Sequence, residues 1–183
     1  IEQGYNIIFG TTFGYIDAMA EMAEEYPDVI FLHCSGYLSN DSNFGNYFGK
    51  MYQPRYLAGL QAGEMTTSNK IGYVAAFPIP EVIRGINAFA AGVKEVNPEA
   101  TVEVVWTFTW FGPEEETQAA NALIETGVDV LAQHQDSPST GLVAEANGAK
   151  WISYNTNYGQ SAAPEAYTGA PVWDWGPYYV SVV

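Results

Sequence analysis

The sequence is poor in cysteine, in basic residues and in long apolar runs, and each shortage excludes a class of protein. Its 183 residues include a single cysteine, Cys34, which excludes an internal disulfide and a cysteine metal cluster and is most simply a buried structural residue. Only 6 Lys and Arg accompany 21 Asp and Glu, and the net charge of -15 would repel nucleic acid. Solubility is the simpler explanation of this acidity. No apolar run approaches the length of a membrane-spanning helix.

Signatures of catalysis and of cofactor binding are also missing. The chain has two histidines, and one of them, His33, lies in an apolar run, so a histidine metal site is not expected. The sequence has no Gly-x-Ser-x-Gly turn for a nucleophile, no Gly-x-Gly-x-x-Gly after a strand and no P-loop. His134 and Asp136 have Ser137 and Ser139 close by, but without such a turn they favour a binding protein over an enzyme. We expect no catalytic residue, no metal and no cofactor.

Apolar and β-branched runs alternate with helical patterns along the chain. The expected strands cover residues 5–9, 29–33, 70–76, 102–107, 128–133, 151–155 and 168–175. Helices are expected over 16–23, 52–65, 80–97 and 113–125, then after 136 and after 176, and residues 35–50 are expected to form a glycine-rich loop. Strands that alternate with helices predict an α/β fold with doubly wound parallel sheets.

The most informative stretch runs from Thr101 to Glu116. It begins with β-branched and aromatic residues that suit a strand, and Gly112, Pro113 and three glutamates then mark a helix start. Trp110 and Phe111 therefore stand at the carboxyl end of a strand, where open α/β sheets bind ligands. The alternative, that either ring belongs to the core, remains open for each residue taken alone.

Further aromatic, amide and carboxylate side chains follow other expected strands. Because parallel strands end at the same edge of a sheet, these side chains would form aromatic walls with a few polar groups between them, which suits a planar, hydrogen-bonding small molecule. The candidate ligand-binding residues are Phe13, Asp17, Trp110, Phe111, Gln133, His134, Asp136, Asn155 and Trp173.

Five motifs resemble those of a known family. They are Phe-Gly-Thr-Thr-Phe-Gly-Tyr-Ile-Asp (9–17), Tyr-Leu-Ala-Gly-Leu-Gln-Ala-Gly (56–63), Lys-Ile-Gly-Tyr-Val-Ala-Ala-Phe-Pro-Ile-Pro-Glu-Val (70–82), Trp-Phe-Gly-Pro (110–113) and Val-Trp-Asp-Trp-Gly-Pro-Tyr-Tyr (172–179). Over essentially its whole length the chain is similar to the basic membrane protein (BMP) family of substrate-binding lipoproteins, which serve ABC importers and bind purine nucleosides or related compounds.

The resemblance implies a periplasmic-binding-protein-like clamshell of two α/β lobes, each a parallel sheet flanked by helices. Residues 1–68 would belong to the N-terminal lobe and 69–155 to the C-terminal lobe, and 156–183 would return to the N-terminal lobe. The start of the first lobe, with one aromatic wall of the site, and the C-terminal end are expected to be absent. We further expect a monomer that works with ABC permease subunits in the periplasm or at the cell surface, lipid-anchored through an absent N-terminal segment.

The resemblance also assigns roles to individual residues. Phe111 matches the aromatic residue that stacks on the base, and Asp17 matches the carboxylate that binds the base edge, although a charge at a helix N-terminus explains Asp17 equally well. The segment Gln133–Ser137 replaces a glycine-rich loop that contacts the ligand in nucleoside binders.

Two departures from the family pattern concern the sugar. Asn155 stands where nucleoside binders carry an aspartate for the ribose hydroxyls, and Trp173 stands where they carry a lysine. Less room and fewer partners for ribose predict a free purine base, adenine-like, as the ligand. A sensory receptor domain of the same fold and, less favoured, a nucleoside-processing enzyme that uses His134 and Asp136 are the alternatives.

Overall fold

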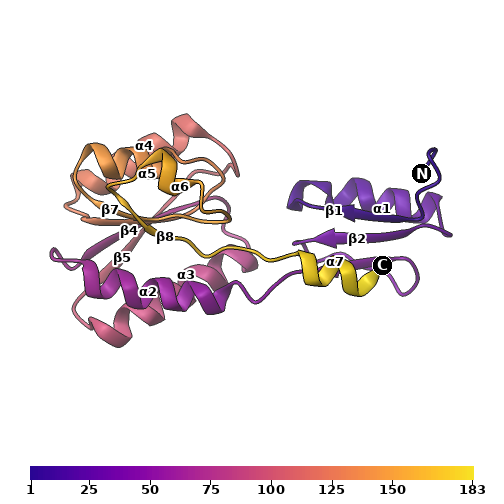
Figure 1. The fold of residues 1–183 in the computed structure, drawn as a ribbon, viewed down its shortest axis with the longest axis horizontal. Helices are drawn as coiled ribbons and strands as arrows, with labels where there is room; N and C mark the ends of the chain where they lie inside the picture. Colours follow the sequence, from indigo (N-terminus) through magenta and orange to yellow (C-terminus); the bar gives the residue numbers. More distant parts are fainter. The chain divides into compact units, whose positions relative to one another are not determined.

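The computed structural model describes residues 1–183 and divides into two units, Ile1–Gly49 (unit 1) and Lys50–Val183 (unit 2). Unit 1 holds a parallel three-stranded sheet of order β1-β2-β3 with the helix α1 packed against it (Figure 1). Its elements are β1 (Ile7–Gly10), the short 3-10 helix η1 (Phe13–Tyr15), α1 (Ile16–Glu25), β2 (Ile30–Cys34) and β3 (Phe44–Tyr47).

A buried asparagine joins the elements of unit 1. The side-chain amide of Asn43 donates hydrogen bonds to the carbonyls of Ala23, Tyr26 and Val29, at 2.9, 3.1 and 2.9 Å. Three carbonyls at the end of α1 and just before β2 thus share the two N–H groups of one buried side chain. The start of β3 is in this way fixed beside α1 and β2.

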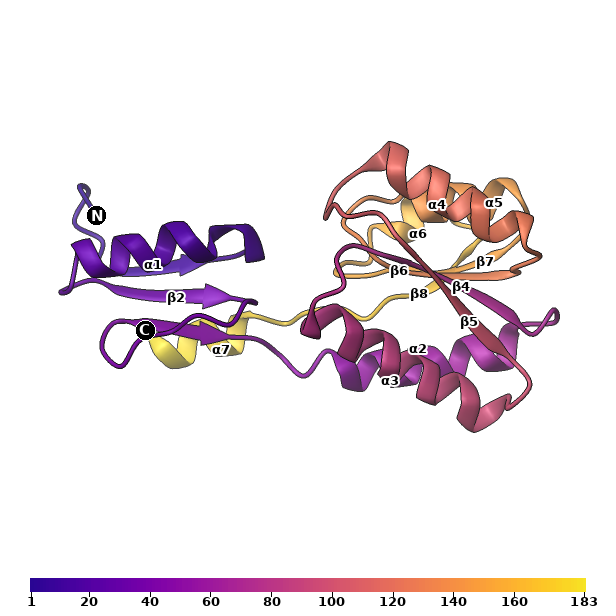
Figure 2. The same cartoon turned by 180° about the vertical axis from the view of Figure 1, so that it is seen from behind.

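Unit 2 holds a parallel five-stranded sheet of order β5-β4-β6-β7-β8. The strands are β4 (Lys70–Ala75), β5 (Thr101–Trp106), β6 (Val130–His134), β7 (Lys150–Ile152) and β8 (Tyr167–Gly169). The helices are α2 (Tyr52–Met65), α3 (Pro80–Val96), α4 (Pro113–Glu125), α5 (Ser139–Ala146), α6 (Gly159–Ala162) and α7 (Gly176–Val182). In both views α2 and α3 cover one face of this sheet, and α4, α5 and α6 cover the other (Figures 1 and 2).

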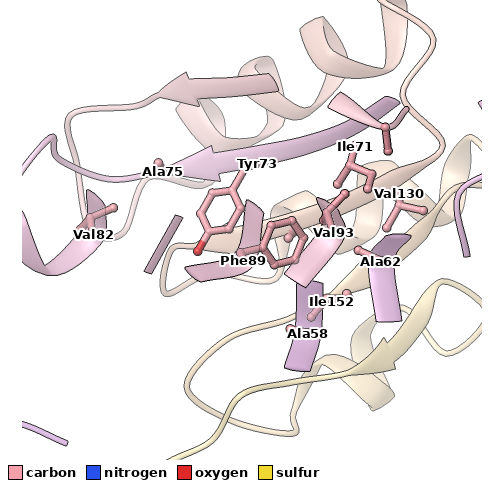
Figure 3. Packing of buried hydrophobic residues seen from close by; sticks show 12 residues of the cluster. Ala58, Ala62, Ile71, Tyr73, Ala75, Val82, Phe89, Val93, Val130 and Ile152 are labelled. Carbon is pink, nitrogen blue, oxygen red and sulfur yellow. The ribbon is translucent and has the colours of Figure 1, made fainter. Parts of the chain in front are cut away.

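Two glycines let α2 and α3 approach each other at backbone distance. A Cβ atom on Gly59 would lie 2.0 Å from the carbonyl oxygen of Phe89, and one on Gly92 would lie 2.1 Å from that of Tyr56. Between these helices and the sheet the ring of Phe89 meets Tyr73 edge-on, with centroids 5.3 Å apart (Figure 3). Both rings are fully buried, so this face of the sheet carries a dense core.

Trp151 occupies the core on the opposite face of the sheet. A Cβ atom on Gly141 of α5 would lie 2.2 Å from the indole ring, so only glycine fits there. The indole Nε1 donates to Gln133 Oε1 at 2.8 Å, which gives this buried polar atom a partner. The second core therefore lies directly beneath the end of β6.

Most expected elements are confirmed, but β3 was not expected, and the strand expected over 168–175 ends at Gly169 as β8. The loop expected over 35–50 contains β3, which pairs in parallel with β2. The helix α2 packs against α3 and lies in unit 2. Strand β8 pairs in parallel with β7, and Val172 forms an isolated bridge with Asn155. No helix is both long and apolar enough to cross a membrane.

Candidate functional site at the carboxyl edge of the unit 2 sheet

The strand order places a topological switch point between β4 and β6. The chain moves from β4 to β5 on one side and later returns to β6 on the other side of β4. In open α/β sheets the loops diverge at such a point, and ligands bind outside the carboxyl ends of the strands there. The segments that follow β4, β5, β6 and β7 carry Phe77, Trp110, Asp136 and Asn155 to this edge.

Aromatic rings form a continuous cluster along the edge. Phe77 lies 5.3 Å from Trp110 and 6.5 Å from Phe108, measured between ring centroids. Trp110 in turn lies 6.0 Å from the His134 ring, and His134 lies 4.4 Å from Tyr154. Phe111, which follows Trp110 directly, is 64% exposed. The clustered rings, with the exposed Phe111 next to Trp110 in the sequence, give the segments at this edge apolar surface of the kind that a flat ligand needs.

Three polar side chains form a chain of hydrogen bonds across the same edge. Asn155 Nδ2 donates to Asp136 Oδ1 at 2.6 Å, and Trp173 Nε1 donates to Asn155 Oδ1 at 2.8 Å. Desolvation of its carboxyl group raises the pKa of Asp136, and the hydrogen bond from Asn155 acts in the opposite direction. The sequence placed these three residues in the site, and the structure brings them together through these contacts.

Buried side chains support the loop that carries Asp136. Gln133 Nε2 donates to the carbonyls of Gln135 and Ser137, at 3.0 and 2.8 Å, so this amide holds the loop from below. The Ser137 hydroxyl donates to Glu116 Oε2 at 2.7 Å. Burial raises the pKa of Glu116, against the effect of its hydrogen bonds. The loops after β5 and β6 are also tied directly, because the Asp136 N–H donates to the Trp110 carbonyl at 3.0 Å.

A buried cation lies below the aromatic cluster. Arg55 of α2 is fully buried; its Nη1 donates to the Gln133 carbonyl at 2.7 Å, and its Cζ lies 3.9 Å from the centroid of the Tyr154 ring. Such a cation–π contact is strengthened by desolvation. Burial, and then the charge of Arg55, hold the pKa of His134 well below its usual range, so this imidazole is neutral at physiological pH. Glu81 Oε1 lies 3.8 Å from His134 Nε2.

The family model for ABC transporter substrate-binding proteins of the PnrA-like type, called Bmp, matches residues 1–183. The chain belongs to this family. The fold expected from its motifs, parallel sheets flanked by helices in a periplasmic-binding-protein-like arrangement, is confirmed by the structure and by its structural neighbours.

Relatives within and near the Bmp family carry different ligand names. A putative ABC transporter glucose-binding protein of Haloferax volcanii is 52% identical over 174 residues, which are 95% of this chain and 44% of the relative. A purine-binding protein of Brucella abortus is 40% identical over 182 residues, 97% of this chain and 50% of the relative. The chain thus spans about half the length of these curated relatives.

A solved structure shares the fold at low sequence identity. An ABC transporter solute-binding protein from Aeropyrum pernix K1 superposes with a TM-score of 0.77 at 18% identity, over 91% of this chain and 50% of its own. At that identity the likeness concerns the fold alone.

The two remaining candidate ligand-binding residues, Phe13 and Asp17, lie in unit 1. Phe13 is half-buried in η1, and its ring lies 6.5 Å from that of Tyr37. Asp17 is exposed in the first turn of α1, where a carboxylate also complements the helix dipole. Both follow β1, as the sequence indicates, and their part in ligand binding stays a prediction.

Sequence reasoning did not single out Arg55, Tyr154 or Phe108. Arg55 sits in a helix of small residues, and a lone arginine in such a helix reads as a surface residue unless burial is known. Phe108 has φ 56°, a left-handed conformation that is unusual for a bulky residue, and it is 64% exposed. The one available signal was its position two residues after the end of β5.

Proposed function

We propose that the protein is the substrate-binding component of an ABC importer and that it binds a purine-type ligand, with a free base such as adenine favoured over a nucleoside. The observation that carries the proposal is the carboxyl edge of unit 2, where the exposed ring of Phe111 follows Trp110 in a loop bonded to that of Asp136. Aromatic faces stack on a heterocycle, and a carboxylate accepts its N–H groups. The name of the Brucella abortus relative supports a purine.

The preference for a base over a nucleoside comes from Asn155 and Trp173. The family resemblance implies that nucleoside-binding members carry an aspartate and a lysine at these two positions, and that both lie at the ribose. Here the Asn155 amide is engaged at both ends, by Asp136 and by the Trp173 indole. These two bonds use one N–H and one lone pair of the amide and fix its direction, so a sugar hydroxyl at this point meets a neutral, already oriented group instead of a free carboxylate.

Calorimetric titration of the full-length protein with adenine, adenosine and glucose tests the proposal. We expect adenine to bind most tightly. Adenosine binding at least tenfold tighter than adenine, a difference of about 1.4 kcal/mol, would contradict the base preference. Binding of glucose without either purine would contradict the purine class altogether and would agree with the name of the Haloferax volcanii relative.

Phe111→Ala tests the stacking surface. Because Phe111 is 64% exposed, we expect the variant to lose affinity for adenine by tenfold or more while its melting temperature stays within about 2 °C of the wild type. Leu142→Ala on α5 is the matched control, since Leu142 is also an exposed apolar side chain and lies outside the edge. A lower melting temperature with unchanged affinity would assign Phe111 to packing alone.

The remaining expectations for the full-length protein follow from the family and are part of the proposal. These are delivery of the ligand to permease subunits outside the cytoplasm, a lipid anchor and a monomeric state. Ligand contact by Phe13 and Asp17 of unit 1 and the division into lobes, with residues 156–183 returning to the N-terminal lobe, also stay predictions. Light scattering on the full-length protein distinguishes a monomer from a dimer.

A further inference from the structure

The orientation of the Asn155 amide is determined by its two partners. The Trp173 indole Nε1 can only donate a hydrogen bond, so the atom it meets must be the amide oxygen. The ionised Asp136 carboxylate can only accept, so the atom that faces it must be the amide nitrogen. If the amide were flipped, its NH2 group would face the indole N–H donor and its oxygen would face the carboxylate oxygen. The chain of bonds therefore runs in one direction, from the indole through the amide to the carboxylate.

The backbone at Asn155 is adapted to this bridging position. Its φ is 67°, in the left-handed region that Asn and Asp tolerate better than other side chains do. Asn155 also forms an isolated parallel bridge with Val172, which brings Trp173 alongside. Asn155 thus joins the segment that follows β7 to the one that follows β8, and its side chain reaches the loop after β6.

We propose that Asn155 is a positioning residue that holds the carboxylate of Asp136 in place, and that Asp136 is the specificity-determining group that accepts N–H donors from a neutral heterocycle. This inference rests on the proposed function and refines it. The family resemblance implies that residue 155 contacts the sugar of the ligand. We place the selective polar contact with the ligand at Asp136 instead. Asn155 then contributes to selectivity by being engaged with its neighbours rather than by contacting the ligand.

The chemistry of Asp136 suits that role. The side chain is exposed, and its bond to Asn155 engages only Oδ1. A carboxylate has about four lone-pair sites on its two oxygens and accepts charge-assisted hydrogen bonds, which are stronger than neutral ones. A base with an exocyclic amino group offers such donors, whereas unsubstituted purine lacks that group. The site should therefore distinguish adenine from purine.

Two single variants separate the two roles in the full-length protein. Asp136→Asn keeps the shape and still offers an oxygen to the Asn155 amide, but it removes the charge. We expect the wild type to prefer adenine to purine at least tenfold and Asp136→Asn to reduce this preference below threefold. Asn155→Asp keeps the left-handed backbone but places two carboxylates against each other. We expect adenine affinity to fall at least tenfold and the adenosine-to-adenine affinity ratio to rise.

The double exchange Asp136→Asn with Asn155→Asp is the matched control for folding. An amide at 136 can donate to a carboxylate at 155, and that carboxylate can still accept from Trp173. We expect the melting temperature to return to within about 2 °C of the wild type, while the preference for adenine over purine stays lost. A purely structural pair would recover both properties in the double variant.

The outcomes distinguish this inference from the proposed function. Wild-type protein that binds adenine, with an adenine-to-purine preference that Asp136→Asn leaves unchanged, overturns the inference and leaves the proposed function intact. Recovery of the adenine preference in the double exchange also overturns it. Wild-type protein that binds no purine overturns both.

Discussion

The two units each contain a parallel sheet, and helices cover the sheet of unit 2 more completely than that of unit 1. In unit 2 helices cover both faces of the sheet, and Ile71, Phe89 and Leu131 are completely buried. Unit 1 has one long helix and a smaller core, in which even Phe44 keeps 4% exposure and Ile30 on the middle strand is 44% exposed. Because parallel sheets are normally covered on both faces, unit 2 holds the elements of an independent core and unit 1 does not.

The charge distribution adds a second difference. Seven of the 21 acidic residues lie in unit 1, together with none of the six lysines and arginines. Unit 2 carries 14 acidic residues against all six basic ones. Unit 1 therefore combines the smaller core with acidic charge that no Lys or Arg of its own offsets, and like charges within a compact unit reduce its stability.

The largest expected effect is the loss of a core ring from unit 2. Phe89→Ala should lower the free energy of unfolding by about 4 kcal/mol, because the ring is fully buried between α3 and the sheet and leaves a cavity. Phe44→Ala in unit 1 should cost less, about 3 kcal/mol, because a looser core can collapse around the missing ring. Hydrogen exchange resolved by peptide measures each unit separately. Equal losses in both units would break the comparison.

A methyl group added between α2 and α3 should have the next largest effect. Gly59→Ala places a Cβ atom 2.0 Å from a backbone oxygen, which cannot move as a side chain can, so we expect a loss of about 3 kcal/mol. Gly14→Ala in unit 1 is the matched control, since a Cβ atom there meets nothing within 4 Å; it should change stability by less than about 0.5 kcal/mol. Denaturant unfolding of both variants provides the measurement. A tolerated Gly59→Ala would show that the helix contact is loose.

Acid should destabilise the turn at residues 66–68 of unit 2, which Asp129 binds, and should leave the stability of the turn before β3 in unit 1 unchanged. Although desolvation acts to raise it, hydrogen bonds from Thr66, Thr67 and Ser68 lower the pKa of Asp129 from 3.8 to about 2. A lowered pKa in the folded state contributes stability above pH 3.8, and this contribution is lost as the pH falls toward about 2. The turn before β3 is held instead by the neutral amide oxygen of Asn40, which does not titrate in this range.

Asp129→Asn isolates this contribution. At pH 7 we expect a loss of about 1 kcal/mol after allowance for solvent screening, because Asp129 is only partly buried. Between pH 4 and pH 2 the difference between variant and wild type should shrink. Thermal melts across this range measure it, and a difference that stays constant with pH would contradict the assignment.

Salt should have the smallest effect and should favour unit 1. Raising the ionic strength from 0.1 to 1 M shortens the screening length from about 10 to about 3 Å and weakens repulsion between exposed charges. We expect the free energy of opening to rise by roughly 0.5 kcal/mol in unit 1 and by less in unit 2. Hydrogen exchange at the two ionic strengths provides the test, with sucrose as the uncharged control. A uniform gain in both units would point to a general salt effect.

The sequence predicts the regular elements of unit 2 well and its side-chain directions poorly. Pro80, Pro113 and the glutamates of α4 mark helix starts by local chemistry, so α3 and α4 begin where expected. The strand β3 was missed because Gly45 and Asn46 have low strand propensity, and its pairing with β2 overrides that preference.

The candidate site shows the same limit. The sequence places Gln133 and Asp136 three residues apart after one strand, and both were expected to face the ligand. The structure shows that Gln133 is buried and supports the loop, whereas Asp136 is exposed. Which of two neighbouring side chains turns inward depends on Trp151, 18 residues away, whose indole needs the Gln133 oxygen. Local patterns contain no information on such a distant partner.

Under the proposed function, Phe108 sets the stability of the backbone against ligand binding. Its left-handed backbone costs on the order of 1 kcal/mol for a phenylalanine and nothing for a glycine. A glycine at this position would relieve that strain, at the cost of a more flexible unfolded chain and of a ring that lies 6.5 Å from Phe77. If homologues also carry phenylalanine at this position, ligand binding by the ring would outweigh the backbone strain that it causes.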